Sequence, residues 1–454
     1  MQLETESLSI LKRAIEKMSE GFESLPDVPA SVDYKAIESV LMMAAERMQD
    51  NYPYMHPYYA GQMLKPPHLV ARLAYSLALF INPNNHALDG GRASSAMEKE
   101  AVAEIATMFG FEKHLGHLTS GGTMANLEAL WVASKLKPNK KVVASKQAHY
   151  THSRISGVLG IDYQSIEVDS RNRMCLKDLE RQLATGEVGT VVVTLGTTST
   201  GSVDPLPGIL KLKEKYDFRI HIDSAYGGYF KLVDNLDEEA SAAYKLTNRA
   251  DSIVVDPHKH GLQPYGCGCV IFADPACGAL YKHDSPYTYF SSAELHLGEI
   301  SLECSRAGAS AVALWTTQKL LPLVREGEFA SALSKSRDAA KQLHSRLASD
   351  KRFAVPFQPE LDIVVWAIKA ESVERSSDLA RKVFEEAAKN NLHLALAGLP
   401  ASLFDQVWDS KSEGSETVMC LRSCLMKPEH LNYIDQLWSL LSQSVDSVIA
   451  VHRA

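Results

Sequence analysis

Hydrophobic positions recur at helical spacing near the start of the chain. Leu8, Leu11, Ile15 and Met18 follow one another at intervals that place them on one face of a helix. A break around residues 27–29 separates this pattern from a second helical pattern over residues 34–49. The two patterns predict an N-terminal helical arm over residues 1–50.

Short, nearly continuous apolar runs alternate with longer helical patterns in the middle of the chain. They cover residues 141–145, 190–195, 219–223, 251–255 and 269–272. Such an alternation is typical of an α/β protein whose sheet is mostly parallel and covered by helices on both faces. Ligands of these sheets bind beyond the carboxyl ends of the strands, so the residues after each run are the candidate site.

The pattern changes after about residue 330. Long charged helical stretches at residues 334–349 and 376–391 accompany apolar runs at residues 361–366 and 417–422. This indicates a smaller α+β domain over residues 331–454. Residues 51–330 are then the large, ligand-binding domain.

Charge and composition narrow the function. The formal net charge of −8 over 454 residues disfavours nucleic-acid binding. The first residues carry several glutamates and lack the apolar core of a signal peptide, and no apolar run reaches the roughly 20 residues of a membrane span. The 7 scattered cysteines do not suggest a disulfide framework. We therefore expect a cytoplasmic protein without a membrane or nucleic-acid partner.

Two of the expected strand ends carry candidate binding groups. A Ser-Gly-Gly-Thr turn containing Gly122 and Thr123 opens a helical pattern, which suits either an anion or an ordinary helix start. His149 and His152 stand three residues apart, but no third ligand has matching spacing, so we expect no metal. The flat ring of His149 could instead stack on a cofactor.

Two further strand ends supply opposite charges. Asp223 closes an apolar run, where a buried carboxylate needs a cationic partner, and Lys259 follows a later run as a candidate amine nucleophile. An anion-binding turn, a carboxylate and a lysine in this order match the phosphate, ring nitrogen and aldehyde of pyridoxal 5′-phosphate (PLP). The pattern predicts a PLP enzyme.

The chain resembles the group II PLP-dependent amino acid decarboxylases over about residues 50–320, and more loosely beyond. The resemblance rests on a set of short motifs: His56-Pro57 with Gln62, Ser-Gly-Gly-Thr at 120–123, Gln147-Ala-His149, Leu-Gly-Thr-Thr at 195–198, His221-Ile-Asp223-Ser-Ala225-Tyr, and Asp256-Pro-His258-Lys259. It implies an aspartate-aminotransferase-type fold with a mostly parallel seven-stranded sheet. It also implies a homodimer with active sites at the interface.

The resemblance assigns roles to most of these residues. Lys259 would hold PLP as a Schiff base, Asp223 would pair with the ring nitrogen, and His149 would stack on the ring. The remaining cofactor contacts would come from Gly122, Thr123, Thr197, Ala225 and His258.

The same resemblance addresses the substrate and the reaction. Arg422 matches an arginine that binds the substrate α-carboxylate, and Gln62 favours an acidic amino acid such as aspartate or glutamate. Tyr287 and Tyr289 are alternative proton donors to the substrate Cα. Residues 84–95 depart from the family pattern and leave the substrate open.

The expected reaction is decarboxylation of an L-amino acid to an amine and CO2. The alternatives are carbon–carbon cleavage of the sphingosine-phosphate lyase type, transamination, and a PLP-binding regulator or retired enzyme.

Overall fold

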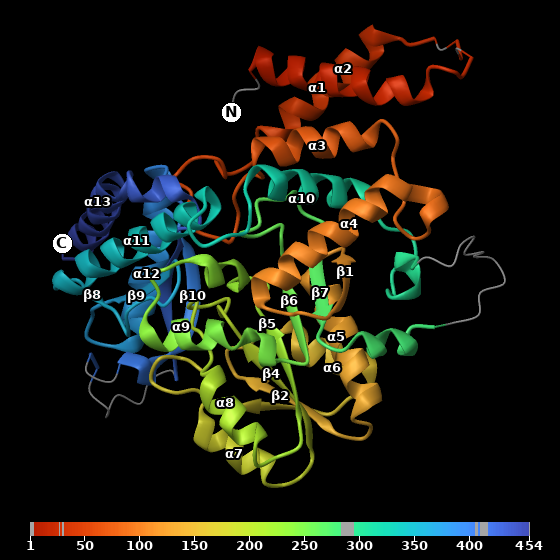
Figure 1. The fold of residues 1–454 in the computed structure, drawn as a ribbon. Helices are drawn as coiled ribbons and strands as arrows, with labels where there is room; N and C mark the ends of the chain where they lie inside the picture. The colour runs from red at the N-terminus through yellow and green to blue at the C-terminus, as the bar shows by residue number, and fades with distance from the viewer. Residues whose placement is uncertain are drawn as a thin grey trace.

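The computed structural model describes residues 4–26, 28–29, 31–282, 295–404, 407–408 and 416–453. Two sheets organise the chain, as Figure 1 shows. The larger one has seven strands in the order β1-β7-β6-β5-β4-β2-β3. Its strands are β1 (Leu115–Thr119), β2 (Lys141–Ser145), β3 (Tyr163–Ile166), β4 (Val188–Thr194), β5 (Arg219–Asp223), β6 (Ser252–Val255) and β7 (Gly268–Phe272).

Strand directions confirm the mostly parallel sheet that the apolar runs predict. β7 is antiparallel to its neighbours β1 and β6, and the other pairs are parallel. The apolar runs did not reveal β3, because its sequence Tyr-Gln-Ser-Ile is half polar and only Ile166 is fully buried.

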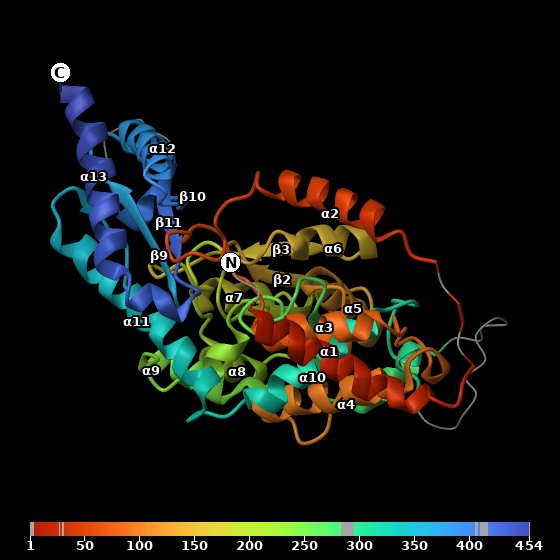
Figure 2. The same cartoon turned by 90° about the horizontal axis from the view of Figure 1, so that it is seen from above.

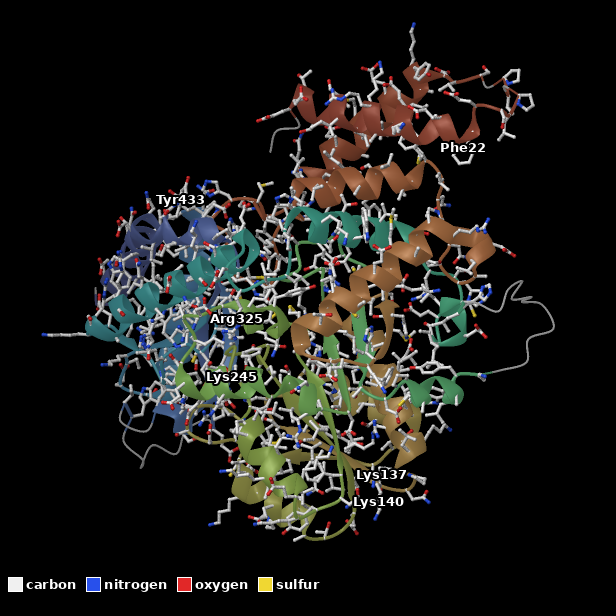
Figure 3. The ribbon with its side chains drawn as sticks, in the orientation of Figure 1. Phe22, Lys137, Lys140, Lys245, Arg325 and Tyr433 are labelled. Atoms are coloured by element: carbon white, nitrogen blue, oxygen red, sulfur yellow. The ribbon has the colours of Figure 1, made fainter. Side chains whose placement is uncertain are left out.

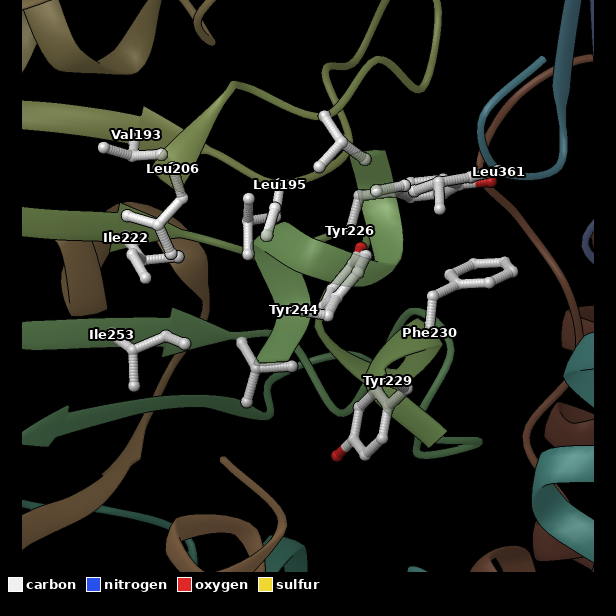
Figure 4. Close-up of a cluster of buried hydrophobic side chains, with 14 of the residues drawn as sticks. Val193, Leu195, Leu206, Ile222, Tyr226, Tyr229, Phe230, Tyr244, Ile253 and Leu361 are labelled. Carbon is white, nitrogen blue, oxygen red and sulfur yellow. The ribbon is translucent and has the colours of Figure 1, made fainter. Parts of the chain in front are cut away.

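Helices cover both faces of this sheet. Val254 of β6 packs with Ala129 of α5 on one face. Its neighbour Ile253 joins the large core cluster on the other face, which Figure 4 shows beside Ile222 and Leu195. The helices of this region are α3 (Leu69–Leu79), α4 (Leu88–Phe109), α5 (Gly122–Leu136), α6 (Thr151–Leu159), α7 (Leu176–Leu183), α8 (Leu206–Lys213), α9 (Glu238–Lys245) and α10 (Gly308–Leu320).

The second sheet is antiparallel and has four strands in the order β10-β11-β9-β8. They are β8 (Phe353–Ala354), β9 (Ile363–Ile368), β10 (Ala395–Pro400) and β11 (Thr417–Cys424). The helices α11 (Glu328–Ser349), α12 (Val373–Lys389) and α13 (Ile434–Arg453) pack against it, at one side of the larger sheet in Figure 2. Trp366 is fully buried in the core between them.

The arm forms the two predicted helices, α1 (Thr5–Ser19) and α2 (Tyr34–Met48). α2 buries none of its residues and stands away from the sheets in Figure 1. Phe22, labelled on the arm in Figure 3, is 52% exposed. None of the helices in the described part of the chain combines the length and apolar composition needed to span a bilayer.

Candidate active site

A cavity of about 310 Å³ lies where several strands of the larger sheet end. Its wall includes Thr194 at the end of β4, Asp223 at the end of β5, and Asp256 directly after β6. The structure brings most of the predicted cofactor residues to this wall, namely Gly122, Thr123, His149, Asp223, Ala225, His258 and Lys259.

The first turn of α5 forms one end of the cavity. Free backbone N–H groups and the positive end of the helix dipole favour an anion at such a terminus. A Cβ atom on Gly122 would lie 2.6 Å from a carboxylate oxygen of Asp256, so this position has no room for a side chain. The lack of a side chain leaves the helix terminus accessible to a ligand.

Asp223 is held by two hydrogen bonds. The Nε2 atom of His152 lies 2.8 Å from one carboxylate oxygen, and the backbone N–H of Ala225 donates to the other at 3.0 Å. Burial alone would raise the pKa of Asp223, but the contacts with His152 and Ala225 hold it well below its usual range. The strand end therefore presents a negative charge to the cavity.

Lys259 and Asp256 form an ion pair within one loop. The Nζ atom of Lys259 lies 3.0 Å from Asp256, whose side chain is 3% exposed. His258 also approaches Asp256, at 3.5 Å, and burial lowers the pKa of this histidine. The amine is thus fixed at the cavity wall beside a carboxylate.

His149 reaches the cavity from the residues just before α6. Its Nδ1 atom accepts a hydrogen bond from the Thr151 backbone at 3.2 Å. Burial lowers the pKa of His149, so the neutral ring is favoured. A neutral, flat ring is suited to stacking on a heterocycle.

Arg422 and Gln62 meet next to the cavity although they lie far apart in the sequence. Arg422, on β11, donates to the side-chain oxygen of Gln62 at 2.7 Å and to the backbone oxygen of Thr198 at 3.0 Å. Thr198 lines the cavity. Arg422 is 6% exposed, its Nε has no hydrogen-bond partner, and no carboxylate pairs with it among the described residues.

One predicted cofactor residue, Thr197, does not line the cavity. Thr197 is fully buried, because its hydroxyl is hydrogen-bonded to Thr200 at 2.9 Å and accepts from the Ser202 backbone at 3.0 Å. Its neighbours in the loop line the cavity instead. Tyr287 and Tyr289 lie outside the described residues.

Comparison with known protein families shows which family the chain belongs to. The model of the pyridoxal-dependent decarboxylase conserved domain matches residues 23–369. The chain belongs to the pyridoxal-dependent decarboxylases. The L-tyrosine decarboxylase of Enterococcus faecium is 26% identical over 82% of this chain and 79% of its own length. The L-aspartate decarboxylase of Thermococcus kodakarensis is 28% identical over 63% of this chain and 73% of its own length.

Solved structures agree on the fold of this decarboxylase. Mouse CSAD superposes with a TM-score of 0.78 at 18% identity, covering 97% of this chain and 99% of that one. Oryza sativa TDC with PLP and tryptamine superposes with a TM-score of 0.76 at 17% identity, covering 98% and 99%. The resemblance, the PLP dependence, the fold and the amino acid decarboxylation expected from the sequence are confirmed.

The cavity of this decarboxylase offers one group for each of the three handles of PLP. A helix terminus for the phosphate, a carboxylate for the ring nitrogen and an amine for the aldehyde all lie on one wall. In the described part of the chain, no group of three or more His, Cys, Asp or Glu side chains is placed to hold a metal ion.

Sequence patterns missed the residues that hold this wall from behind. Asp362, directly before β9, accepts a hydrogen bond from Tyr226 at 2.7 Å and lies 3.2 Å from His260. Tyr226 follows Ala225 and His260 follows Lys259, so one buried carboxylate contacts both of these loops of the cavity wall. Only its position before an apolar strand could have drawn attention to Asp362.

Proposed function

We propose that this decarboxylase acts on an acidic L-amino acid, with L-aspartate as the first candidate. The observation that carries the binding of an amino acid is the buried guanidinium of Arg422, which has no carboxylate partner among the described residues; the choice of an acidic one rests on Gln62. A buried cation of this kind is costly unless an anion pairs with it. The substrate α-carboxylate would be that anion.

Gln62 supports the choice of an acidic substrate. Its side-chain oxygen accepts from Arg422, which leaves its amide N–H groups as donors beside Arg422. A second carboxylate on the substrate could accept from them. The similarity to the Thermococcus kodakarensis L-aspartate decarboxylase agrees with this assignment.

The residues of the wall would divide the chemistry between them. PLP, when bound, withdraws electrons from the substrate Cα. Lys259 would bond to the cofactor aldehyde and give way to the substrate amine. Asp223 would hold a proton at the cofactor ring nitrogen, and Gly122 and Thr123 would bind its phosphate. His149 and Ala225 would enclose the ring, with His258 near the phosphate.

The substrate contacts would select the bond that breaks. Arg422 would orient the carboxylate so that the bond between Cα and the carboxyl carbon is cleaved, releasing CO2. The electron pair left at Cα would take up one proton, and either Tyr287 or Tyr289 would donate it. The net reaction consumes one proton for each amine formed.

L-Tyrosine is the second candidate substrate. The Enterococcus faecium relative is an L-tyrosine decarboxylase. An aromatic cluster also lies shortly before Gln62, with the rings of Tyr54 and Tyr59 centred 4.9 Å apart and His393 in contact with Tyr52. These rings could receive an aromatic side chain.

The deciding experiment measures CO2 release from a panel of L-amino acids by the PLP-loaded protein. The expected order is aspartate, then glutamate, with tyrosine far below. A Gln62→Leu variant should lose activity on aspartate by about 10- to 150-fold, because a lost hydrogen bond to a charged group is worth about 1.5–3 kcal/mol. Faster release from tyrosine than from either acid would replace the proposal with the second candidate.

We also propose a homodimer that works in the cytoplasm on a small-molecule substrate, without nucleic-acid or membrane partners. The fully exposed helix α2 supports the dimer, and 7 free cysteines suit a reducing compartment. Within each protomer, we propose an arm at residues 1–50, a PLP-binding domain at 51–330 and a small domain at 331–454.

A further inference from the structure

His152 lies directly behind Asp223 and faces away from the solvent. It is the second residue of α6, and its side chain is fully buried. Its Nε2 atom lies 2.8 Å from the Asp223 carboxylate, across 71 positions of the chain. The contact joins α6, which packs over the larger sheet, to the end of the central strand β5.

The surroundings of His152 define which ring nitrogen donates. Its Nδ1 atom is buried and has no hydrogen-bond partner among the described residues. Its Nε2 atom faces the Asp223 carboxylate, and an ionised carboxylate can only accept a hydrogen bond. The Nε2 atom therefore carries a proton, His152 donates, and Asp223 accepts.

The neighbouring charged groups do not replace this donor. Both ring nitrogens of His221 are occupied, by Asn126 at 2.7 Å and Ser252 at 2.9 Å. Lys259 pairs with Asp256. His149 contacts Thr151 through its Nδ1 atom. His152 is therefore the side chain that supplies a hydrogen bond to Asp223 in the described part of the chain.

We propose that His152 is a positioning residue that orients the Asp223 carboxylate and keeps it ionised for the cofactor ring nitrogen. The proposal rests on the function proposed above, in which Asp223 holds a proton at that nitrogen. A charge-stabilising hydrogen bond of this kind acts through Asp223 and does not touch the substrate. The histidine pair His149 and His152 thus divides into one ring on the cavity wall and one behind it.

Two variants separate the hydrogen bond from the packing. His152→Leu removes the donor, whereas His152→Gln retains an N–H donor at the end of the side chain. Ser156→Ala is the matched control, because Ser156 is equally buried one turn further along α6 and contacts neither Asp223 nor the cavity wall. This control should behave as the parent protein.

The first readout needs no cofactor. In apoprotein labelled with ¹⁵N-histidine, the His152 ring should show a proton on Nε2. Its Nε2 proton signal should shift in Asp223→Asn. A ring protonated on Nδ1 alone, or a signal that ignores Asp223→Asn, overturns the proposal whatever reaction the enzyme catalyses.

The second readout uses the PLP-loaded protein with ¹⁵N in the cofactor ring. His152→Leu should move the ring-nitrogen signal towards its unprotonated position and lower kcat about 10- to 100-fold, with KM changed less than threefold. His152→Gln should restore most of the ring-nitrogen signal and most of kcat. An unchanged ring-nitrogen signal in His152→Leu overturns the inference if Asp223→Asn does shift it. If Asp223→Asn does not shift it either, the proposed role of Asp223 is wrong.

Discussion

The ends of β5 and β6, which form the cavity floor, and the N-terminal arm differ in burial. In the floor, Ile222 of β5 and Val254 of β6 are fully buried by side chains of their own chain. Leu41 and Met48 of the arm helix α2 are 58% and 69% exposed. The floor residues are packed by their own chain, whereas α2 buries none of its residues against the described part of that chain. We infer that α2 is available for assembly.

Polar contacts also differ between the cavity floor and the arm. Behind the cavity, buried groups such as Asp223 and Asp362 each meet two partners. On the arm, the ion pairs of Lys12 and Arg13 are exposed and contribute little to stability. Substitutions in the floor should therefore change catalysis and stability, and substitutions in the arm should change association.

The largest effect is expected at Lys259. Lys259→Ala should lower kcat by at least about 10³-fold, because it removes the amine that bonds to the cofactor. Borohydride reduction followed by peptide mapping should find the cofactor on Lys259 in the parent and on no lysine in the variant. Lys319→Ala, which breaks an exposed ion pair on α10, is the control and should keep full activity. Another labelled lysine would show that the assignment is wrong.

Asp223→Asn should have the next largest effect. The amide retains the shape but not the charge, so kcat should fall about 10²- to 10³-fold while PLP still binds. Steady-state rates and PLP titration of the same preparations would check this. A rate within a few-fold of the parent would mean that another group stabilises the ring-nitrogen proton.

These residues show how far the sequence predicts such a site. Gly122, Asp223 and Lys259 each follow an apolar strand, and parallel strands bring their carboxyl ends to one edge, so local patterns suffice to group them. Local patterns do not reveal the residues that hold these side chains in place. The contacts of Asp223 with His152, Tyr226 with Asp362, and Gln62 with Arg422 join residues 71, 136 and 360 positions apart.

At two places, residues that are close in the sequence have side chains that point in different directions. His149 and His152 stand three apart, as metal ligands on a helix can, but the local chain sends one ring to the cavity and the other to Asp223. In the loop after β4, residues 197–200 all carry hydroxyl groups, and the turn directs Thr197 into hydrogen bonds within the loop. Side-chain direction in a turn depends on backbone geometry that composition does not specify.

The arm supplies the next prediction, on association. Leu41 lies on one face of α2 with Ile37 and Met48, all exposed. In the proposed homodimer, Leu41→Asp buries a charge in both copies of the interface and should weaken the dimer at least about 100-fold. Sedimentation across a concentration series would measure this.

The opposite face of α2 provides the control. Glu46 points to the side of the helix away from Leu41. Glu46→Lys changes the charge there and should leave the dimer dissociation constant within a few-fold of the parent value. The thermal stability of each isolated protomer should not change in either variant, because both side chains are exposed. A parent protein that sediments as an active monomer would contradict the division between floor and arm.

The smallest expected effect is a pH dependence of the free energy of unfolding, which comes from His221. His221 of β5 is 1% exposed, donates to Asn126, accepts from Ser252, and has a pKa that burial and the nearby His152 lower to about 3. Unfolding returns the pKa to about 6.5, so the unfolded chain binds the extra proton as the pH falls. Stability from this residue is therefore present above pH 6.5 and is lost progressively below it.

Between pH 7 and pH 5 this loss amounts to about 2 kcal/mol, since each pH unit below the unfolded pKa is worth about 1.4 kcal/mol. Urea unfolding of the parent and of His221→Gln at both pH values should show the parent losing about 2 kcal/mol more than the variant. Residues 1–50 contain no histidine, and carboxylates titrate near pH 4, so the dimer dissociation constant should stay constant over the same range. A parent and a variant with equal pH dependence would mean that His221 is already protonated in the folded protein, and the hydrogen bond to its Nδ1 atom would then have to be reversed.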